Sequence, residues 1–325
     1  MITNFAFWYK NATVWLNHCH NDFYKGSEMF KGLSAFPLTP LSGGEIEEKS
    51  FTSLIENLVD AGVDSIGALG STGSYAYLTR KQRYLATKLA VSAAADIPVI
   101  TSIGHVRAEE VLLLAEDAQK AGVSGVLLAP VSYQKLSADE VFNFYQRITS
   151  ELSVPLCIYD NAATTGFEFT DELLVSLSSL PRVGSIKLGD FPADCNAASR
   201  RVENLKKRVS EGVTIGISGD TQSAAGMMAG CSVWYSVLGG VFPRYSKRLA
   251  QAALSGDINE THHLNEALEP LWTFYRHYGS LRVIASVAEI LGVVPSPCLP
   301  FPLQSLTGEK RASLENILNH LNFLN

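Results

Sequence analysis

Short apolar runs alternate along the chain with longer segments in which apolar residues recur at helical spacing. The spacing i, i+3, i+4 and i+7 is clearest at Val111, Leu114, Ala115 and Ala118. A buried strand followed by such a helix, repeated many times, is typical of a parallel sheet. The predicted strands span residues 32–38, 65–69, 99–103, 125–129, 156–159, 184–188, 214–218 and 232–238.

Eight strand–helix units in succession predict an α/β fold, a closed (β/α)8 TIM barrel over residues 31–243. An open doubly wound sheet is the alternative, but neither a G-x-G-x-x-G fingerprint nor a P-loop motif occurs in the sequence. Gly62 and Gly122 are predicted to end two of the helices in the left-handed conformation. The helices predicted between strands include residues 45–61, 81–95, 108–121, 138–152 and 194–211.

The chain on either side of the barrel follows other patterns. Amphipathic segments and a proline-rich turn at residues 295–302 predict a C-terminal helical region, residues 244–325, that packs on the barrel. Residues 1–30 fit neither part, so we expect an N-terminal extension that is either disordered or the product of a mis-assigned translation start. The C-terminal helices are predicted at residues 245–253, 258–279, 280–291 and 311–324.

The extension carries two patterns that could be mistaken for functional signals. Its cluster of aromatic residues lacks the basic start and the clean apolar stretch of a secretory signal. Its run His18-Cys19-His20 offers metal-ligating side chains, but three adjacent residues do not converge easily on one tetrahedral ion. No metal site is therefore predicted there.

Composition and charge limit the class of protein. Hydrophobic residues make up 46% of the 325-residue chain and charged residues 18%, which excludes a disordered protein. A formal net charge of −6 argues against a nucleic-acid partner, and no apolar stretch approaches the ~18 residues that cross a membrane. Five cysteines without a C-x-x-C pair indicate neither a disulfide framework nor a zinc knuckle. We expect a cytoplasmic, globular protein.

Candidate chemistry is sought at the C-terminal ends of the strands, where barrels of this type carry their active sites. Lys187 lies near the end of the sixth predicted strand, where burial favours the neutral amine that attacks a carbonyl to form a Schiff base. The alternative is a structural lysine whose ammonium reaches water. Tyr159 ends the fifth predicted strand and could move a proton at the same place, or it could be a core aromatic with one hydrogen bond.

The loop after the second predicted strand adds a possible anion site. In Gly70-Ser71-Thr72-Gly73, two glycines bracket two hydroxyl residues, so a tight turn can direct amides and hydroxyls at a carboxylate. An ordinary turn between a strand and a helix uses similar residues. His105, after the third strand, could line a pocket, whereas Asp190 and Asp220 could contact a substrate or cap helices.

Taken together, Gly70-Ser71-Thr72-Gly73, Tyr159 and Lys187 resemble the dihydrodipicolinate synthase / N-acetylneuraminate lyase family. The resemblance runs from about residue 31 to the C-terminus and includes Ala35-Phe36-Pro37-Leu38-Thr39-Pro40 and Ser218-Gly219-Asp220. It implies a class I aldolase-type lyase without a metal or an organic cofactor. It also implies a homo-oligomer, either a tetramer or a dimer.

The resemblance assigns a role to each matching residue. Lys187 would form a Schiff base with pyruvate or another 2-oxo acid, and Tyr159 would move protons to and from the adduct. Ser71, with Thr72, would hold the carboxylate of the 2-oxo acid and could also relay protons. The substrate-binding residues that the resemblance implies are Gly70, Ser71, Thr72, Gly73, Tyr133, Thr164 and Gly219.

Several positions depart from the family pattern. Ser74 stands where most members carry glutamate, and Thr164 stands about where the synthases carry an arginine that grips the second substrate's carboxylate. A threonine cannot supply a bidentate cationic grip. The second tyrosine of the synthase relay could be matched by Ser132 or by Tyr133, and the acidic pair of the sialate lyases is not matched cleanly by Asp220-Thr221-Gln222.

The sequence therefore predicts a lyase or aldolase that acts on a 2-oxo acid through Lys187, with an altered site for the second substrate. One alternative is a true 4-hydroxy-tetrahydrodipicolinate synthase. A second is a barrel that binds a keto acid without turning it over. A third is an aldolase for a sugar phosphate, which would favour a phosphate-binding site after the seventh and eighth strands.

Overall fold

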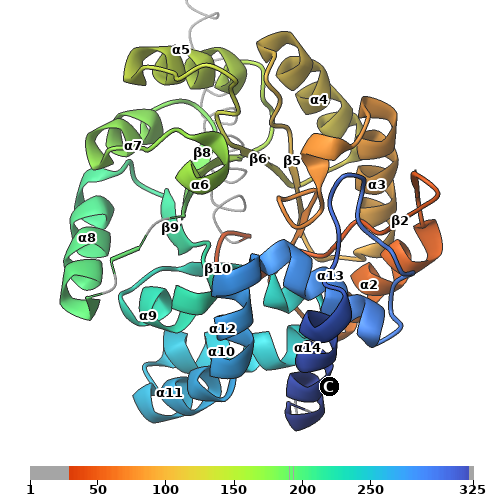
Figure 1. Ribbon diagram of the computed structural model, residues 1–325. Coiled ribbons are helices and arrows are strands. Elements are labelled where there is room, and N and C mark those ends of the chain that lie inside the picture. Colours follow the sequence, from red (N-terminus) through yellow and green to blue (C-terminus); the bar gives the residue numbers. More distant parts are fainter. Residues whose placement is uncertain (1–28, 190, 193, 322–325) are drawn as a thin grey trace, which may run out of the picture.

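The computed structural model describes residues 29–189, 191–192 and 194–321. Eight parallel strands close into a barrel in the order β1-β10-β9-β8-β7-β6-β5-β4, and helices surround it (Figure 1). This arrangement confirms the predicted TIM barrel. The strands are β1 (Gly32–Ala35), β4 (Ser65–Ala68), β5 (Val99–Ser102), β6 (Gly125–Leu128), β7 (Leu156–Tyr159), β8 (Val183–Leu188), β9 (Thr214–Ile217) and β10 (Val233–Ser236).

The first and last strands are shorter than predicted. Pairing in β1 ends at Ala35, since Pro37 has no amide hydrogen to offer a neighbouring strand. Pairing in β10 ends at Ser236, because the chain then enters a 3₁₀ turn, η3 (Leu238–Gly240). The helix predicted from residue 45 begins later, because residues 45 and 46 pair as β3 (Glu45–Ile46) with β2 (Leu41–Ser42).

Local signals explain where several barrel helices begin and end. Thr79 and Gln82 form a capping box before α3, and Ser137 and Glu140 form another before α5. Gly122 ends α4 with φ 90°, as predicted, and Gly62 has φ 64° just after α2. The helices of the barrel are α2 (Glu48–Asp60), α3 (Arg80–Ala93), α4 (Ala108–Ala121), α5 (Ala138–Thr149), α6 (Ala162–Thr165), α7 (Asp171–Ser178), α8 (Cys195–Arg208), α9 (Ser223–Met228) and α10 (Pro243–Ser255).

The C-terminal region is helical, as predicted, but its helices are divided differently. The single helix predicted over residues 258–279 is wrong, because Pro270 cannot donate a hydrogen bond to the preceding turn and starts a new helix. Figure 1 shows α10 to α14 gathered on one side of the barrel, opposite α5. The helices after α10 are α11 (Ile258–Ala267), α12 (Glu269–Tyr278), α13 (Ser280–Ile290) and α14 (Gly308–His320).

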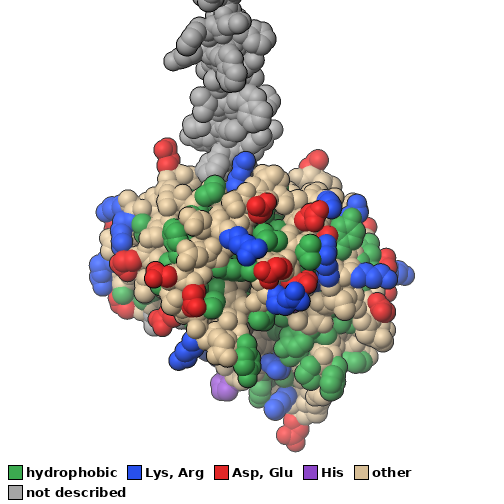
Figure 2. Space-filling view, turned by 90° about the horizontal axis from the view of Figure 1, so that it is seen from above, with side chains coloured by type: hydrophobic (Ala, Val, Ile, Leu, Met, Phe, Trp, Pro, Cys, Tyr) green, Lys and Arg blue, Asp and Glu red, His purple; other side chains and the backbone are tan. Residues whose placement is uncertain are grey.

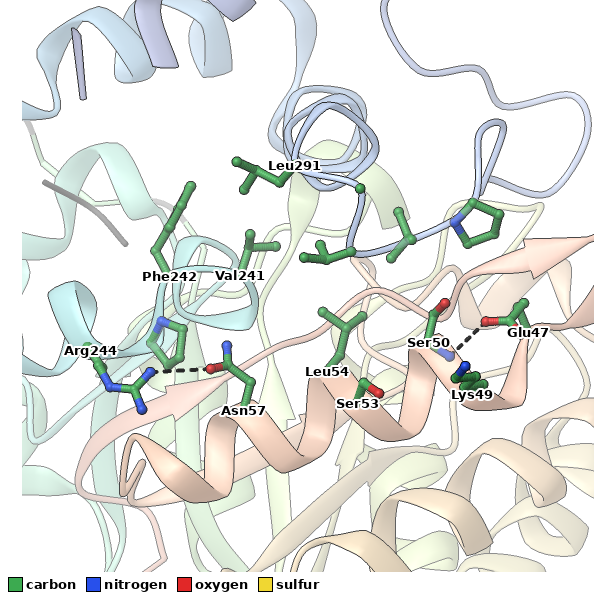
Figure 3. A pocket seen from close by; sticks show the side chains of 15 residues that line it. Glu47, Lys49, Ser50, Ser53, Leu54, Asn57, Val241, Phe242, Arg244 and Leu291 are labelled. Carbon is green, nitrogen blue, oxygen red and sulfur yellow. Dashed lines mark hydrogen bonds between the residues drawn. The ribbon is translucent and has the colours of Figure 1, made fainter. Parts of the chain in front are cut away.

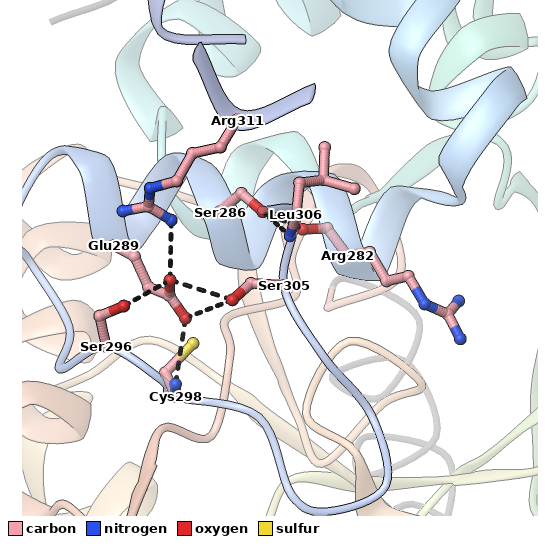
Figure 4. Close-up of polar contacts among 8 residues, drawn as sticks. All are labelled: Arg282, Ser286, Glu289, Ser296, Cys298, Ser305, Leu306 and Arg311. Atoms are coloured by element: carbon pink, nitrogen blue, oxygen red, sulfur yellow. Dashed lines mark hydrogen bonds and ion pairs between the residues drawn. The ribbon is translucent and has the colours of Figure 1, made fainter. Parts of the chain in front are cut away.

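A buried carboxylate fixes the proline-rich segment between α13 and α14 (Figure 4). Glu289 accepts hydrogen bonds from Ser296 at 2.8 Å, from the Cys298 amide at 3.1 Å and from Ser305 at 2.9 and 3.0 Å. Arg311 pairs with it at 2.9 Å. Burial alone would raise the pKa of Glu289, but the hydrogen bonds from Ser296, Ser305 and Cys298 outweigh it and lower that pKa.

The interior of the barrel has its own small apolar cluster, separate from the larger one between strands and helices. At one end of the interior, Met29 and Phe30 are buried. They are the two residues that precede the predicted start of the barrel at residue 31. A side chain at Gly184 would lie 2.9 Å from the Phe30 ring. The ring therefore fits against β8 only because residue 184 has no side chain. Residues 1–28, with His18-Cys19-His20, lie outside the described residues, and the predicted boundaries at residues 30 and 243 stay predictions.

Lysine and arginine side chains lie interspersed with aspartate and glutamate over the face that Figure 2 shows. Within the described part of the chain, no helix is long and apolar enough to cross a membrane.

Candidate active site

Strand register brings the two main candidates together at one level of the barrel. Tyr159 at the end of β7 pairs with Lys187 near the end of β8. Two residues earlier on β8, Ser185 bonds the Tyr235 hydroxyl across the interior at 2.6 Å, so this face of β8 points inward. Lys187 is 4% exposed and Tyr159 6% exposed.

Three aromatic rings surround the amine of Lys187. The Lys187 Nζ atom lies 4.0 Å from the ring centre of Phe36, 4.1 Å from that of Tyr159 and 5.4 Å from that of Tyr235. The amine makes no hydrogen bond or ion pair with any residue that the structure describes. Ring faces attract an ammonium but do not form an ion pair with it, as a carboxylate would. The amine can therefore react without first breaking an ion pair.

Glycines in the second strand unit make room for one of these rings. A side chain at Gly70 would lie 2.4 Å from Phe36 Cδ1, and one at Gly67 would lie 2.3 Å from Phe36 Cζ. The Phe36 ring can therefore reach Lys187 only because both positions lack a side chain. This packing gives Gly70 a second role beside the one that the resemblance implies.

The hydroxyl of Tyr159 stands between two polar side chains. Asn161 donates a hydrogen bond from Nδ2 to this hydroxyl at 3.0 Å. Ser71 Oγ lies 3.4 Å from it on the other side. With Asn161 as its donor, the Tyr159 hydroxyl can direct its own proton to Ser71 or to a bound molecule.

The loop over residues 70–73 leaves backbone donors available. None of its four amides donates a hydrogen bond within the part of the chain that the structure describes. Thr72 is buried at 4% exposure, and the residues flanking the loop, Leu69 and Ser74, have φ of 55° and 54°. Such left-handed values are costly away from glycine and cluster at functional loops. Free amides next to the Ser71 hydroxyl make this loop suited to an anion.

Three further predicted substrate-binding residues lie on loops or short helices after the strands. Thr164 is exposed on α6, with its hydroxyl 3.4 Å from the Asn161 carbonyl. Tyr133 is 91% exposed on the loop after β6. Gly219 follows β9 and lines a separate small cavity next to Asp220. Their roles in binding stay predictions.

Asp220 caps a different turn from the one expected. Its carboxylate accepts hydrogen bonds from the amides of Val237 at 3.2 Å and Leu238 at 2.6 Å, and from Trp234 Nε1 at 2.9 Å. It thus joins the loop after β9 to the turn after β10, rather than starting α9. Burial raises the pKa of Asp220 to about 6, although these hydrogen bonds lower it. Asp190 lies outside the described residues.

Sequence reasoning did not single out Phe36, Asn161 or Tyr235. Phe36 and Asn161 lie within segments already noted, two residues or fewer from a strand end. Alternation along the eighth strand points Tyr235 inward, but it does not show that Tyr235 lies next to Lys187. Beside Tyr235, burial raises the pKa of the Cys157 thiol to about 11, so this thiol is protonated and unreactive at neutral pH.

A large groove lies elsewhere on the molecule, between α2 and α10 (Figure 3). It has a volume of about 1100 Å³, and Leu54 and Leu291 point into it. Its polar side chains serve local structure: Glu47 caps the Ser50 amide at 2.7 Å, and Arg244 contacts Asn57 at 3.4 Å. No predicted site residue lines this groove.

The fold defines the class of this protein, a TIM barrel with Tyr159 and Lys187 at its strand ends. Comparison with known proteins gives its family. The model of the Dihydrodipicolinate synthetase family matches residues 29–321. The chain belongs to this family and is a lyase, as the resemblance predicted.

Individual relatives cover most of the chain. The 4-hydroxy-tetrahydrodipicolinate synthase of Persephonella marina is 29% identical over 294 residues, which are 89% of this chain and 98% of the relative. The enzyme of the same name from Halorhodospira halophila is 30% identical over 250 residues, 75% of this chain and 81% of the relative. The crystal structure of dihydrodipicolinate synthase from Agrobacterium tumefaciens has a TM-score of 0.87 and 38% identity, covering 91% of this chain and 99% of that one.

Proposed function

We propose that this lyase condenses pyruvate or another 2-oxo acid with Lys187 and joins the adduct to an aldehyde, or cleaves it in reverse. The observation that carries the proposal is the amine of Lys187, buried against the Tyr159 ring at 4.1 Å and bound to no acid among the described residues. A paired lysine would have to break an ion pair before it could attack a carbonyl.

The reaction follows from the groups around the amine. The neutral Lys187 amine attacks the C2 carbonyl of the 2-oxo acid, and the oxygen leaves as water after it is protonated, with Tyr159 moving the proton. Loss of a proton from C3 gives an enamine, whose C3 forms a bond to the aldehyde carbon. The aldehyde oxygen takes up a proton and becomes a hydroxyl. Water then hydrolyses the imine and frees Lys187.

The carboxylate of the 2-oxo acid would lie against the loop over residues 70–73. Four free amides and the hydroxyls of Ser71 and Thr72 supply neutral donors at this place. Because Ser71 also lies 3.4 Å from the Tyr159 hydroxyl, the carboxylate and the reacting carbonyl would be oriented by neighbouring groups. This local arrangement suits an anion although the chain has a net charge of −6.

The second substrate is proposed to differ from the semialdehyde of the synthases. Thr164 supports this proposal, because it carries no charge and is turned to solvent. The names of the relatives favour the alternative, a 4-hydroxy-tetrahydrodipicolinate synthase. The homo-oligomer and the cytoplasmic location stay predictions, and the 91% exposed Tyr133 suits a contact between copies.

Exchange of the pyruvate methyl protons in D₂O tests the first half of the proposal without a second substrate. Enamine formation at Lys187 predicts deuterium at C3, followed by proton NMR, and Lys187→Met is expected to abolish it. Lys31→Met, at the exposed position just before β1, is the matched control. A protein that binds pyruvate saturably without exchange would be a binding barrel rather than an enzyme.

The choice of second substrate needs a separate assay. We expect pyruvate consumption with the semialdehyde of the synthases to be far slower than with the preferred aldehyde. Ordinary synthase kinetics with that semialdehyde would overturn the proposal of an altered second-substrate site while leaving the Schiff-base chemistry intact.

A further inference from the structure

A cavity of about 180 Å³ lies where α12 and α13 cover the ends of β9 and β10. The barrel contributes Ser218 and Asp220 to its wall, and the helices contribute Tyr275, Arg276 and Ser280. The cavity thus joins the strand ends of the barrel to the C-terminal helical region. The loop over residues 70–73 takes no part in it.

This cavity adjoins the strand that carries Lys187. The amide of Ser218 donates a hydrogen bond to the carbonyl of Leu188 at 2.9 Å, one residue after Lys187. Burial raises the pKa of Asp220 to about 6, while the hydrogen bonds it accepts and the nearby charge of Lys187 lower it. A molecule attached to Lys187 could therefore extend past β9 toward Asp220.

Tyr275 lines this cavity and carries a buried hydroxyl. It is 5% exposed, and its hydroxyl has no hydrogen-bond partner among the described residues. Its ring packs edge-on against Trp272 at 5.3 Å between centres. Burial, and then the charge of Asp220, raise the pKa of Tyr275 well above its ordinary value, so the hydroxyl keeps its proton. A phenylalanine would fill the same space without leaving a donor unpaired.

We propose that Tyr275 determines specificity for the second substrate, by donating a hydrogen bond to an oxygen of an aldehyde that bears hydroxyl groups. The inference rests on the proposed function, because the aldehyde must meet the adduct on Lys187. It adds the C-terminal helical region to the site and gives the second substrate a chemical class.

The charges around the cavity favour hydroxyl groups over a second carboxylate. Arg276 is the cation of the wall, but its guanidinium pairs with Glu269 and contacts Thr273 at 3.1 Å. Asp220 is mostly ionised at neutral pH, and no cation pairs with it among the described residues. A carboxylate beside Asp220 would be repelled, whereas a hydroxyl can accept from Tyr275 and donate to Asp220.

The test uses the full-length protein and measures the reaction of pyruvate with each of three aldehydes. D-Glyceraldehyde and propanal differ by two hydroxyl groups, and succinic semialdehyde carries a carboxylate. We expect wild-type kcat/KM to be highest for glyceraldehyde. Tyr275→Phe should lower the ratio of glyceraldehyde to propanal about 10-fold, the value of one hydrogen bond of about 1.4 kcal/mol, mainly through KM.

Tyr278→Phe is the matched control, because Tyr278 lies on the same helix and its ring faces Lys310 at 5.0 Å. Thermal unfolding checks that Tyr275→Phe folds, with a Tm expected at or above that of the wild type. An unchanged aldehyde ratio in Tyr275→Phe, or a wild-type preference for propanal or the semialdehyde, overturns the inference. Absence of methyl exchange in the wild type would instead overturn the proposed function, and the inference with it.

Discussion

Two charged side chains, Glu289 and Lys187, are buried almost equally in this protein but differ in their polar contacts. Glu289 is 7% exposed and accepts hydrogen bonds from the Ser296–Arg311 segment through both oxygens. Lys187 is 4% exposed and has only ring faces around its amine, among the residues that the structure describes. The first arrangement holds chain segments together, whereas the second leaves the Lys187 amine without a polar partner among the described residues.

The two side chains are expected to contribute differently to stability. Each hydrogen bond to a charged group contributes about 1.5–3 kcal/mol, and leaving a buried charge unpaired costs several times the thermal energy. Glu289 therefore stabilises the fold. Lys187 contributes little to stability that an apolar side chain of similar length would not, and the proposed Schiff-base chemistry would explain its presence.

Lys187→Met should give the largest effect and separate activity from stability. Methionine fits among Phe36, Tyr159 and Tyr235 without a buried amine, so the free energy of unfolding should be unchanged or higher. Exchange of the pyruvate methyl protons should fall by more than about 10⁴-fold. Urea unfolding and NMR check both halves, and a strongly destabilised variant would show that Lys187 is structural after all.

Glu289→Ala should have the converse effect. Removal of the carboxylate leaves Arg311, Ser305 and the Cys298 amide without their partner, so unfolding should become easier by about 3 kcal/mol. Exchange activity per folded molecule should not change. Glu309→Ala, at an exposed position on α14, is the control and should stay within about 0.5 kcal/mol of the wild type.

A smaller effect is expected from acid. The pKa of Glu289 is lowered in the folded protein from its ordinary value of 4.5, so its ionised form is preferred by the fold. The stability that it contributes is present above about pH 4.5 and is lost as the pH falls through the folded value. The difference in unfolding free energy between the wild type and Glu289→Gln should therefore shrink from pH 7 to pH 3. A constant difference would mean that its charge plays no part.

The barrel and its central residues could be predicted because their signals are local. Each strand is a short apolar run, and Tyr159 and Lys187 stand out as polar groups at the ends of such runs. Phe36 and Tyr235 could not be assigned in this way, because they reach the amine only when β1 and β10 pair and close the barrel. The clearance that Gly67 and Gly70 give the Phe36 ring is likewise a contact between distant segments.

The C-terminal region shows where the pattern misled. A continuous helical period runs through residues 258–279, but the helix breaks before Pro270, whose effect on hydrogen bonding outweighs the apolar spacing. The contacts of Glu289 and the unpaired hydroxyl of Tyr275 come from how these helices pack, which periodicity does not encode. The resemblance pointed to Thr164 and Tyr133, which are both exposed, and their roles in binding stay predictions.

Reductive trapping with pyruvate and borohydride shows directly whether Lys187 forms a Schiff base with a 2-oxo acid. Digestion and peptide mass spectrometry of the trapped protein locate the modified lysine. Schiff-base formation at Lys187 predicts one stable adduct, on the peptide that contains Lys187, and none in Lys187→Met. No adduct at millimolar pyruvate, or an adduct on an exposed lysine such as Lys120, would contradict it.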